Sequence, residues 1–230
     1  MPLPYTGQNG ELNFEADVVE LLKKARWEHE VLKNKTIPEL IDNWKDILFE
    51  RNRTTLNNVP LSSDEMDRVM DVVRLQANTP VKANHFVNGR PIAIKRDSDS
   101  PDKQHAGHEV YLDLFSATEI AGGSSRYQIA EQTYFSTDPQ FNDRRGDITL
   151  LINGMPVIHI ELKASGVNVY EASNQIVKYA NEGVWSGFMG LVQVFWAMTP
   201  EDALFFANAG NPTAFNSAFF FRWGDRDNNV

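Results

Sequence analysis

The sequence predicts an α/β fold in which helices flank a mixed β-sheet, with extra helices at the N-terminal end. Apolar residues recur at helical spacing through about residues 1–78 of the 230-residue chain. From about residue 80 to residue 225 they mostly alternate with polar residues or form short apolar runs, as in strands. One further helical segment near residues 169–182 interrupts these strands. Strands and helices that share one chain without a repeat favour a sheet with helices on its faces.

Three segments of the N-terminal part have the marks of helices. Residues 14–30 place Val18 and Leu22 on one side, with acids early and basic residues late, which suits the helix dipole. Residues 37–49 repeat that period. Ser62, three residues before Glu65, resembles a capping box that opens a third helix ending near Gln76.

The rest of the chain is predicted to be rich in strands. The segment PVKANHFVNGRPIAIKRD suggests a hairpin around an Asn-Gly turn at residues 88–89. Further strands are expected in EVYLDLFS, RYQIAEQTYF, GDITLLINGMPVIHIELK, LVQVFWAMT, ALFFAN and FFFRWGD.

Composition limits the class of protein. Hydrophobic residues make up 42% of the chain, enough for a sizeable core, and no linker rich in Pro, Ser or Gly divides residues 1–230, so we expect one domain. The end WGDRDNNV has no obvious closing element, which suits a piece of a longer protein. The chain has no cysteine, no signal-type N-terminus and no run of about 18 apolar residues, so a cytoplasmic protein is the expectation.

The net charge of -9 and the pI near 5.0 argue against a domain that holds nucleic acid by itself. Such binding depends mainly on Lys and Arg that replace phosphate counterions. If the chain acts on DNA, we expect another polypeptide or a metal ion to contribute.

The hairpin at residues 146–163 carries charges where a core strand needs none. Alternation puts His159, Glu161 and Lys163 on one face of its second strand. A strict two-residue turn at Asn153-Gly154 would pair Asp147 with Ile160, whereas a loop with one extra residue would pair it with Glu161. We predict the second arrangement, because Gly can form a bulge and Pro156, which lacks an N–H, sits well beside one.

Asp147 and Glu161 would then converge on one cation. Converging carboxylates are costly unless they are neutralised, and hard oxygen ligands with room for water suit Mg²⁺. Such a site supports phosphodiester hydrolysis, with Lys163 orienting the attacking water or offsetting developing charge. The alternative is a surface ion pair between Glu161 and Lys163, which is the commoner meaning of a bare Glu-x-Lys pattern.

Gln175 and Tyr179 lie four residues apart, on one face of the helix predicted after the hairpin. Gln can donate to a phosphate oxygen, and Tyr adds a hydroxyl on a rigid ring. The alternative is that Tyr179 packs half-buried on the sheet and Gln175 is solvated.

Asp147, then NGMP, then Ile160-Glu161-Leu162-Lys163, then Gln175-x-x-x-Tyr179 together resemble the PD-(D/E)XK nuclease motif with the QxxxY extension of RecB-like nucleases. More narrowly, RRGDITLLINGMPVIHIELKASGVNVYEASNQIVKYANE is similar to the N-terminal nuclease domain of the restriction (R) subunit of type I restriction-modification enzymes.

This resemblance implies a restriction-endonuclease-like fold and a role for each motif residue. Asp147 and Glu161 would bind Mg²⁺, Lys163 would be the catalytic lysine, and Gln175 with Tyr179 would assist substrate placement or active-site geometry. Such nucleases often use a further acid from the first helix, and Glu15 fits that place better than Glu20, although the helix dipole alone also explains an early acid. Gly146 departs from the broader motif, which has Pro before the aspartate.

The resemblance also implies partners. The family's R subunit cleaves double-stranded DNA together with methyltransferase and specificity subunits, and a downstream helicase-like motor uses ATP. No GxxxxGK[ST] pattern occurs in these 230 residues, so an intact motor and its ATP site are not expected within the chain.

Other candidates and other functions remain open from the sequence. His159 could tune the metal site, although a lone strand histidine is more often simply hydrogen-bonded. Arg144 and Arg145 could meet phosphates or be merely solvated. Two other functions compete with the type I enzyme: a non-cleaving module that docks other subunits, and a stand-alone RecB-like nuclease, which the acidic charge disfavours.

Overall fold

The computed structural model describes residues 5–7, 9–87, 89–115, 124–135 and 144–224. The helices within these ranges are α1 (Gly10–Lys24), α2 (Ile37–Arg51), α3 (Ser63–Gln76), α4 (Pro80–Val87) and α5 (Val169–Asn181). The strands are β1 (Val31–Lys33), β2 (Ile92–Lys95), β3 (Glu109–Leu112), β4 (Tyr127–Tyr134), β5 (Arg145–Ile152), β6 (Met155–Leu162), β7 (Val194–Met198), β8 (Ala203–Ala207) and β9 (Phe221–Arg222). The predicted α/β class is confirmed.

A seven-stranded mixed sheet has the order β1-β4-β5-β6-β7-β8-β9, and β2 pairs with β3 in a separate two-stranded sheet. The strands β4, β5 and β6 are antiparallel neighbours, whereas β6 and β7 are parallel and are joined through α5. A parallel pair needs such a crossover, because the chain must return to the same end of the sheet. This architecture is consistent with a restriction-endonuclease-like core.

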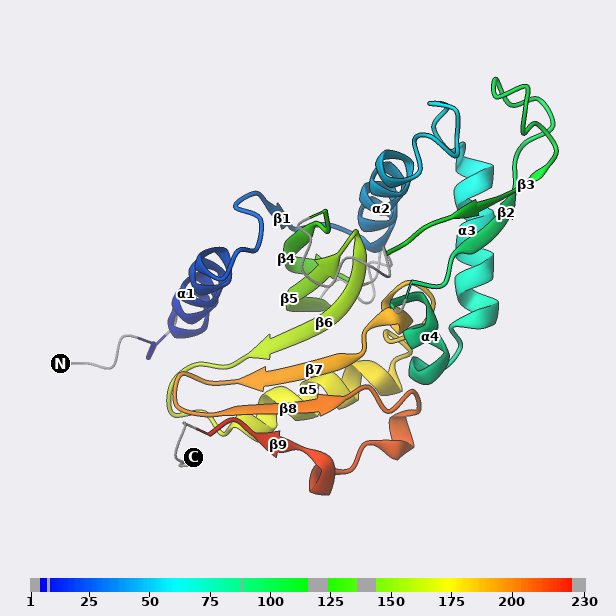
Figure 1. Ribbon diagram of the computed structural model, residues 1–230. Helices are drawn as coiled ribbons and strands as arrows, with labels where there is room; N and C mark the ends of the chain where they lie inside the picture. Colours follow the sequence, from blue (N-terminus) through cyan, green and yellow to red (C-terminus); the bar gives the residue numbers. More distant parts are fainter. Residues whose placement is uncertain (1–4, 8, 88, 116–123, 136–143, 225–230) are drawn as a thin grey trace.

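Helices cover both faces of the large sheet (Figure 1). On one face α1 packs its Phe14 and Val18 against a cluster from β4, β5 and β6 that includes Ile148 and Ile160. On the other face α2, α3, α4 and α5 contribute to a larger apolar cluster. No helix in the described ranges is both long and apolar enough to span a bilayer.

Two of the described helices begin with a capping box, which stabilises the first turn. The predicted capping box of α3 is confirmed, because Ser62 and Glu65 satisfy each other's backbone N–H groups. Thr36 and Glu39 form the same device at α2. The first helix, α1, begins and ends earlier than the predicted residues 14–30.

Two predictions for secondary structure are wrong. Residues 80–87 form α4 rather than a strand, with Pro80 at its first position and Ala83 and Phe86 buried three residues apart. The expected turn at residues 88–89 falls partly outside the described residues, which do not include residue 88. The N-terminal part is not purely helical either, because β1 pairs in parallel with β4.

The hairpin of β5 and β6 has the predicted register, but a different feature produces it. Ile152 pairs with Met155 across a two-residue turn in which Asn153 and Gly154 both have positive φ, as a type I′ turn requires. The extra residue is Val157 inside β6, which forms a bulge next to Pro156. Beyond it Ile148 pairs with Ile160, so the next position along places Asp147 opposite Glu161.

Candidate active site

Asp147 and Glu161 come from the adjacent strands β5 and β6 and are both buried, with 8% and 0% of their surface exposed. Asp147 Oδ2 accepts a hydrogen bond from the backbone N–H of Leu162 at 2.7 Å. This bond ties the aspartate to the residue between Glu161 and Lys163. The hairpin thus brings the two predicted acids to one place, as the register prediction requires.

Burial raises the pKa of both acids to about 8. For Asp147 the charge of Glu161 raises the pKa further, while the hydrogen bond from Leu162 and the charge of Lys163 oppose the shift. Glu161 Oε1 has no hydrogen-bond partner among the described residues, although the atom is fully buried. A buried carboxylate oxygen without a donor is costly, and a bound cation would remove that cost.

Lys163 follows directly after β6 and lies at the same site. Its Nζ is 3.9 Å from Glu161 Oε1 and 3.7 Å from Glu11 Oε2 of α1. It also donates to the carbonyl oxygen of Leu162 at 2.8 Å. The ammonium group is therefore positioned between the two glutamates, with 17% of its side chain exposed.

His159 contacts Glu161 directly, with its Nε2 3.0 Å from Glu161 Oε2, and its Nδ1 lies 3.2 Å from Thr149 Oγ1. Burial lowers the pKa of His159 to about 4, so the ring is neutral at physiological pH and the contact is a hydrogen bond rather than an ion pair. An ionised carboxylate can only accept, so with Glu161 ionised the proton is on Nε2 and the Thr149 hydroxyl donates to Nδ1. The histidine therefore fixes one oxygen of Glu161 and leaves the other free.

Gln175 and Tyr179 of α5 form a hydrogen-bonded chain to β5. Gln175 Nε2 donates to the Tyr179 hydroxyl at 2.7 Å, and that hydroxyl donates to the carbonyl oxygen of Arg145 at 3.0 Å. Tyr179 is buried, and burial followed by the charge of Glu161 raises its pKa. The pair joins α5 to the strand position two residues before Asp147, so it supports the geometry of the site.

Glu15 of α1 is 2% exposed and belongs to the same electrostatic cluster. Burial raises its pKa to about 7, a hydrogen bond from Gln132 opposes the rise, and the charge of Asp147 adds to it. Its Oε2 accepts from Gln132 Nε2, and its Oε1 has no hydrogen-bond partner among the described residues. By contrast, Glu20 is largely exposed and pairs with Lys23.

The glycine that departs from the broader motif has a steric reason here. A Cβ on Gly146 would lie less than 3.0 Å from the rings of Phe135 and His159. These rings belong to an aromatic cluster with Tyr179 and Trp185 behind the carboxylates. The position therefore excludes any larger residue in this arrangement.

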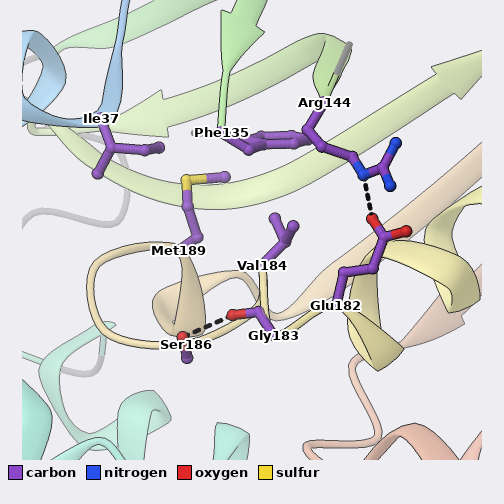
Figure 2. A pocket seen from close by; sticks show the side chains of 8 residues that line it. All are labelled: Ile37, Phe135, Arg144, Glu182, Gly183, Val184, Ser186 and Met189. Atoms are coloured by element: carbon purple, nitrogen blue, oxygen red, sulfur yellow. Dashed lines mark hydrogen bonds and ion pairs between the residues drawn. The ribbon is translucent and has the colours of Figure 1, made fainter. Parts of the chain in front are cut away.

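Arg144 and Arg145 differ in their surroundings. Arg144 forms an ion pair with Glu182 at the end of α5, on the rim of a cavity of about 330 Å³ (Figure 2). This cavity does not include Asp147, Glu161 or Lys163 among its lining residues. The exposed Arg145 lies over the ring of Tyr134, 5.8 Å from its centroid.

The sequence pattern did not identify Glu11 or Gln132. Glu11 precedes the predicted helix start at residue 14, so no helical pattern singled it out. Gln132 gave no signal, because a polar residue near the end of a strand is common. Packing of α1 against the sheet brings Glu11 to the site, whereas Gln132 already lies opposite Asp147 in the sheet.

The donor set fits a magnesium ion. The described residues contain no group of three or more His, Cys, Asp or Glu side chains close enough to hold a metal on their own. Two carboxylates, Asp147 and Glu161, with one buried oxygen unpartnered, nevertheless match Mg²⁺, which binds one or two carboxylates and keeps several waters.

Comparison with known proteins agrees with the geometry. The family model for "Type I restriction enzyme R protein N terminus" matches residues 11–214 of the chain. The chain is 28% identical to a type I restriction enzyme endonuclease subunit of Staphylococcus saprophyticus over 219 residues, which cover 95% of this chain and 21% of that protein. A similarly named subunit of Staphylococcus aureus is 25% identical over 219 residues, again 95% of this chain and 21% of that protein.

A shorter match has higher identity. The endonuclease subunit of the type I restriction enzyme EcoprrI of Escherichia coli is 35% identical over 88 residues, which are 37% of this chain and 28% of that protein. The chain spans about a fifth of the length of the staphylococcal relatives.

Proposed function

The chain belongs to the family of type I restriction enzyme R protein N termini, and from this premise we propose that it is a Mg²⁺-dependent endonuclease domain. Its substrate would be double-stranded DNA, cleaved within a type I restriction enzyme. The observation that carries the proposal is the pair of buried carboxylates on adjacent strands, with Glu161 Oε1 lacking a hydrogen bond from the described residues and the Lys163 ammonium 3.9 Å away.

Each side chain has a role in this proposal. Asp147 and Glu161 would hold the cation, and His159 and the N–H of Leu162 fix the orientation of the two carboxylates. When bound, Mg²⁺ supplies Lewis acidity that polarises the phosphate and lowers the pKa of a bound water. Lys163 would orient the attacking water and offset negative charge that develops on the phosphate.

Gln175 and Tyr179 act on geometry in this proposal. Tyr179 fixes the backbone of β5 at Arg145, close to Asp147, and Gln175 holds the Tyr179 hydroxyl. Glu15 would add a third negative side chain at the site, since its charge interacts with that of Asp147.

The partners follow from the family. We propose that the chain works with methyltransferase and specificity subunits, and with an ATP-driven translocase outside these residues. Relatives about five times longer than the matched part are consistent with such further domains. ATP would then be a requirement of the full-length subunit rather than a ligand of this chain, and the compartment would be the cytoplasm.

The test is cleavage of plasmid DNA by the full assembled enzyme that carries Asp147→Ala or Lys163→Ala. We expect cleavage to fall by about 100-fold or more, because each change removes a group that acts on the charge of the transition state. ATPase activity should stay normal, since translocation does not need these residues.

The matched control is Asp71→Ala, which removes an exposed acid that pairs with Arg74 on α3. It should leave cleavage and ATPase unchanged. Normal cleavage by the Asp147 and Lys163 variants would reject the proposal and favour a non-cleaving module that docks other subunits.

A further inference from the structure

Gln132 has an unusual backbone for a residue inside a strand. It lies within β4 and has a φ of 57°. Side chains other than Gly, Asn and Asp rarely adopt this left-handed region. The other non-glycine residues with positive φ in the described ranges all lie in turns: Arg26, Asn34, Asn57, Asn58 and Asn153.

The pairing of β4 with β5 is interrupted at the same place. Glu131 pairs with Ile148 and Thr133 pairs with Gly146, so Gln132 and Asp147 face each other between these pairs. No residue is inserted in either strand. The interruption therefore comes from the backbone conformation of Gln132. It lies directly opposite Asp147, the candidate metal ligand.

The left-handed conformation changes the face of the sheet toward which the Gln132 side chain points. Gln128 bonds to Asn43 of α2, and Ala130 packs in the cluster that α2 joins, so regular alternation would turn Gln132 toward α2 as well. Instead its amide Nε2 donates to Glu15 of α1, on the opposite face. Figure 1 shows β4 between these two helices.

Glu15 has no evident need to be buried for packing. Its neighbours Phe14 and Val18 already supply the apolar contacts of α1 with the sheet. A buried carboxylate weakens a fold unless its oxygens are partnered, and Glu15 Oε1 has no partner among the described residues. Burial of such a group points to a role at the site.

We propose that Gln132, which lies opposite Asp147, is a positioning residue: its left-handed backbone lets it hold the Glu15 carboxylate with Oε1 available to a water molecule bound to the divalent cation. This inference rests on the proposed function, because it assumes that Asp147 and Glu161 bind the cation. Gln132 itself would not touch the cation and would act only through Glu15.

The test is calorimetric titration of the 230-residue chain with Mn²⁺, for the unaltered protein and for Gln132→Gly. Glycine accepts the left-handed backbone but lacks the amide. We expect Mn²⁺ affinity to fall about 10- to 100-fold, the range seen when a group outside the direct metal ligands is lost. The thermal unfolding midpoint is measured alongside, because glycine relieves the backbone conformation whereas the lost hydrogen bond to Glu15 destabilises the fold.

Two further variants separate positioning from a general structural effect. Asn58→Gly changes another left-handed residue, in an exposed turn, and should keep the Mn²⁺ affinity. Glu15→Gln combined with Gln132→Gly should bind Mn²⁺ no more weakly than Glu15→Gln alone, because both changes remove the same contribution.

The outcomes distinguish this inference from the proposed function. Suppose that Asp147→Ala abolishes Mn²⁺ binding, as the proposed metal site requires. An unchanged Mn²⁺ affinity in Gln132→Gly would then overturn the role of Gln132. So would a loss of affinity in the double variant that exceeds the loss in Glu15→Gln alone. If the unaltered chain does not bind Mn²⁺, or if Asp147→Ala leaves binding intact, both the inference and the proposed metal site fail.

Discussion

The carboxylate of Glu161 is held from one side only. His159 occupies Oε2 with a hydrogen bond, and Lys163 approaches Oε1 no closer than 3.9 Å. A neutral histidine can donate to a carboxylate without cancelling its charge, whereas a close lysine would compete with a cation for the same oxygen. The arrangement therefore keeps Glu161 oriented and leaves its negative charge for a cation.

The raised pKa values predict how stability depends on pH in the absence of metal. The folded state keeps the protons of Asp147 and Glu161 up to a pKa of about 8, whereas an unfolded carboxyl group loses its proton near pH 4. The folded state then binds more protons, so the free energy of unfolding should fall as the pH rises between these values. Urea unfolding in a chelator at several pH values measures this slope.

Asp147→Asn provides the control, because other acids titrate in the same range. The amide cannot ionise. Between about pH 5 and pH 8 the free energy of unfolding of this variant should therefore rise, relative to that of the unaltered chain, by on the order of 1–3 kcal/mol. Mn²⁺ should raise the stability of the unaltered chain more at the higher pH. Equal slopes for the two proteins would show that Asp147 is not held protonated by burial.

At this scale the sequence predicted the residue types and one shared face, but not their partners. Strand alternation places His159, Glu161 and Lys163 together, since it depends only on the period of two. Side-chain packing decides whether His159 or Lys163 bonds to a given oxygen of Glu161. The alternation of a strand does not predict this packing. Glu11 was missed because it reaches the site through the docking of α1, and Gln132 because no sequence signal marks its left-handed backbone.

At the scale of elements, the β5–β6 hairpin sets the spacing of the site. A one-residue shift would place Asp147 opposite Ile160 rather than Glu161. The bulge at Val157 prevents this shift, while the tight turn at Asn153-Gly154 fixes the end of the ladder. The register could be predicted because Gly and Pro156 favour one extra residue in the hairpin. The position of that residue could not be predicted, because an extra residue in the loop and one within the strand give Asp147 the same partner.

Gly154→Ala tests the turn. Gly154 has a φ of 83°, and an added Cβ would lie 2.8 Å from Trp44 Cδ1 and 2.9 Å from its Cα. We expect a loss of about 2–4 kcal/mol in the free energy of unfolding, from backbone strain and from overpacking against α2. Urea unfolding of the purified chain measures the loss.

Gly166→Ala is the matched control, since Gly166 has a φ of 81° and nothing within 4 Å of its Cβ position. Gly166→Ala should lower the free energy of unfolding only by the backbone strain, about 1–2 kcal/mol. Equal losses in the two variants would contradict the role assigned to Trp44.

The misread elements have a common cause. The segment that forms α4 contains Val and Phe and is followed in the sequence by Asn88-Gly89, a combination that locally favours a strand and a turn. Its helix is stabilised by burial of Ala83 and Phe86 against other helices, a tertiary effect. Similarly, β1 is three residues long and depends on pairing with β4, so its own sequence carries little signal.

For the whole molecule, the architecture favours a cation site, whereas the net charge opposes the binding of a polyanion. The site lies where the sheet receives α1 on one face and α5 on the other, an arrangement that can hold a cation in a fixed geometry. The net charge of -9, however, repels a polyanion. Under the proposed function, the domain would therefore have the groups for chemistry on DNA but not the charge for holding DNA.

This contrast predicts the behaviour of the isolated chain. Because counterion release depends on Lys and Arg contacts, we expect the 230-residue chain to bind a short duplex with a dissociation constant of about 10⁻⁴ M or weaker at physiological salt. Fluorescence anisotropy with Ca²⁺ in place of Mg²⁺ measures binding without cleavage, and lower salt should strengthen it only modestly. Cleavage by the isolated chain should be weak or absent, because under the proposed function other polypeptides of the assembled enzyme would supply the contacts to DNA. Robust cutting by the chain alone at physiological salt would instead favour a self-sufficient nuclease.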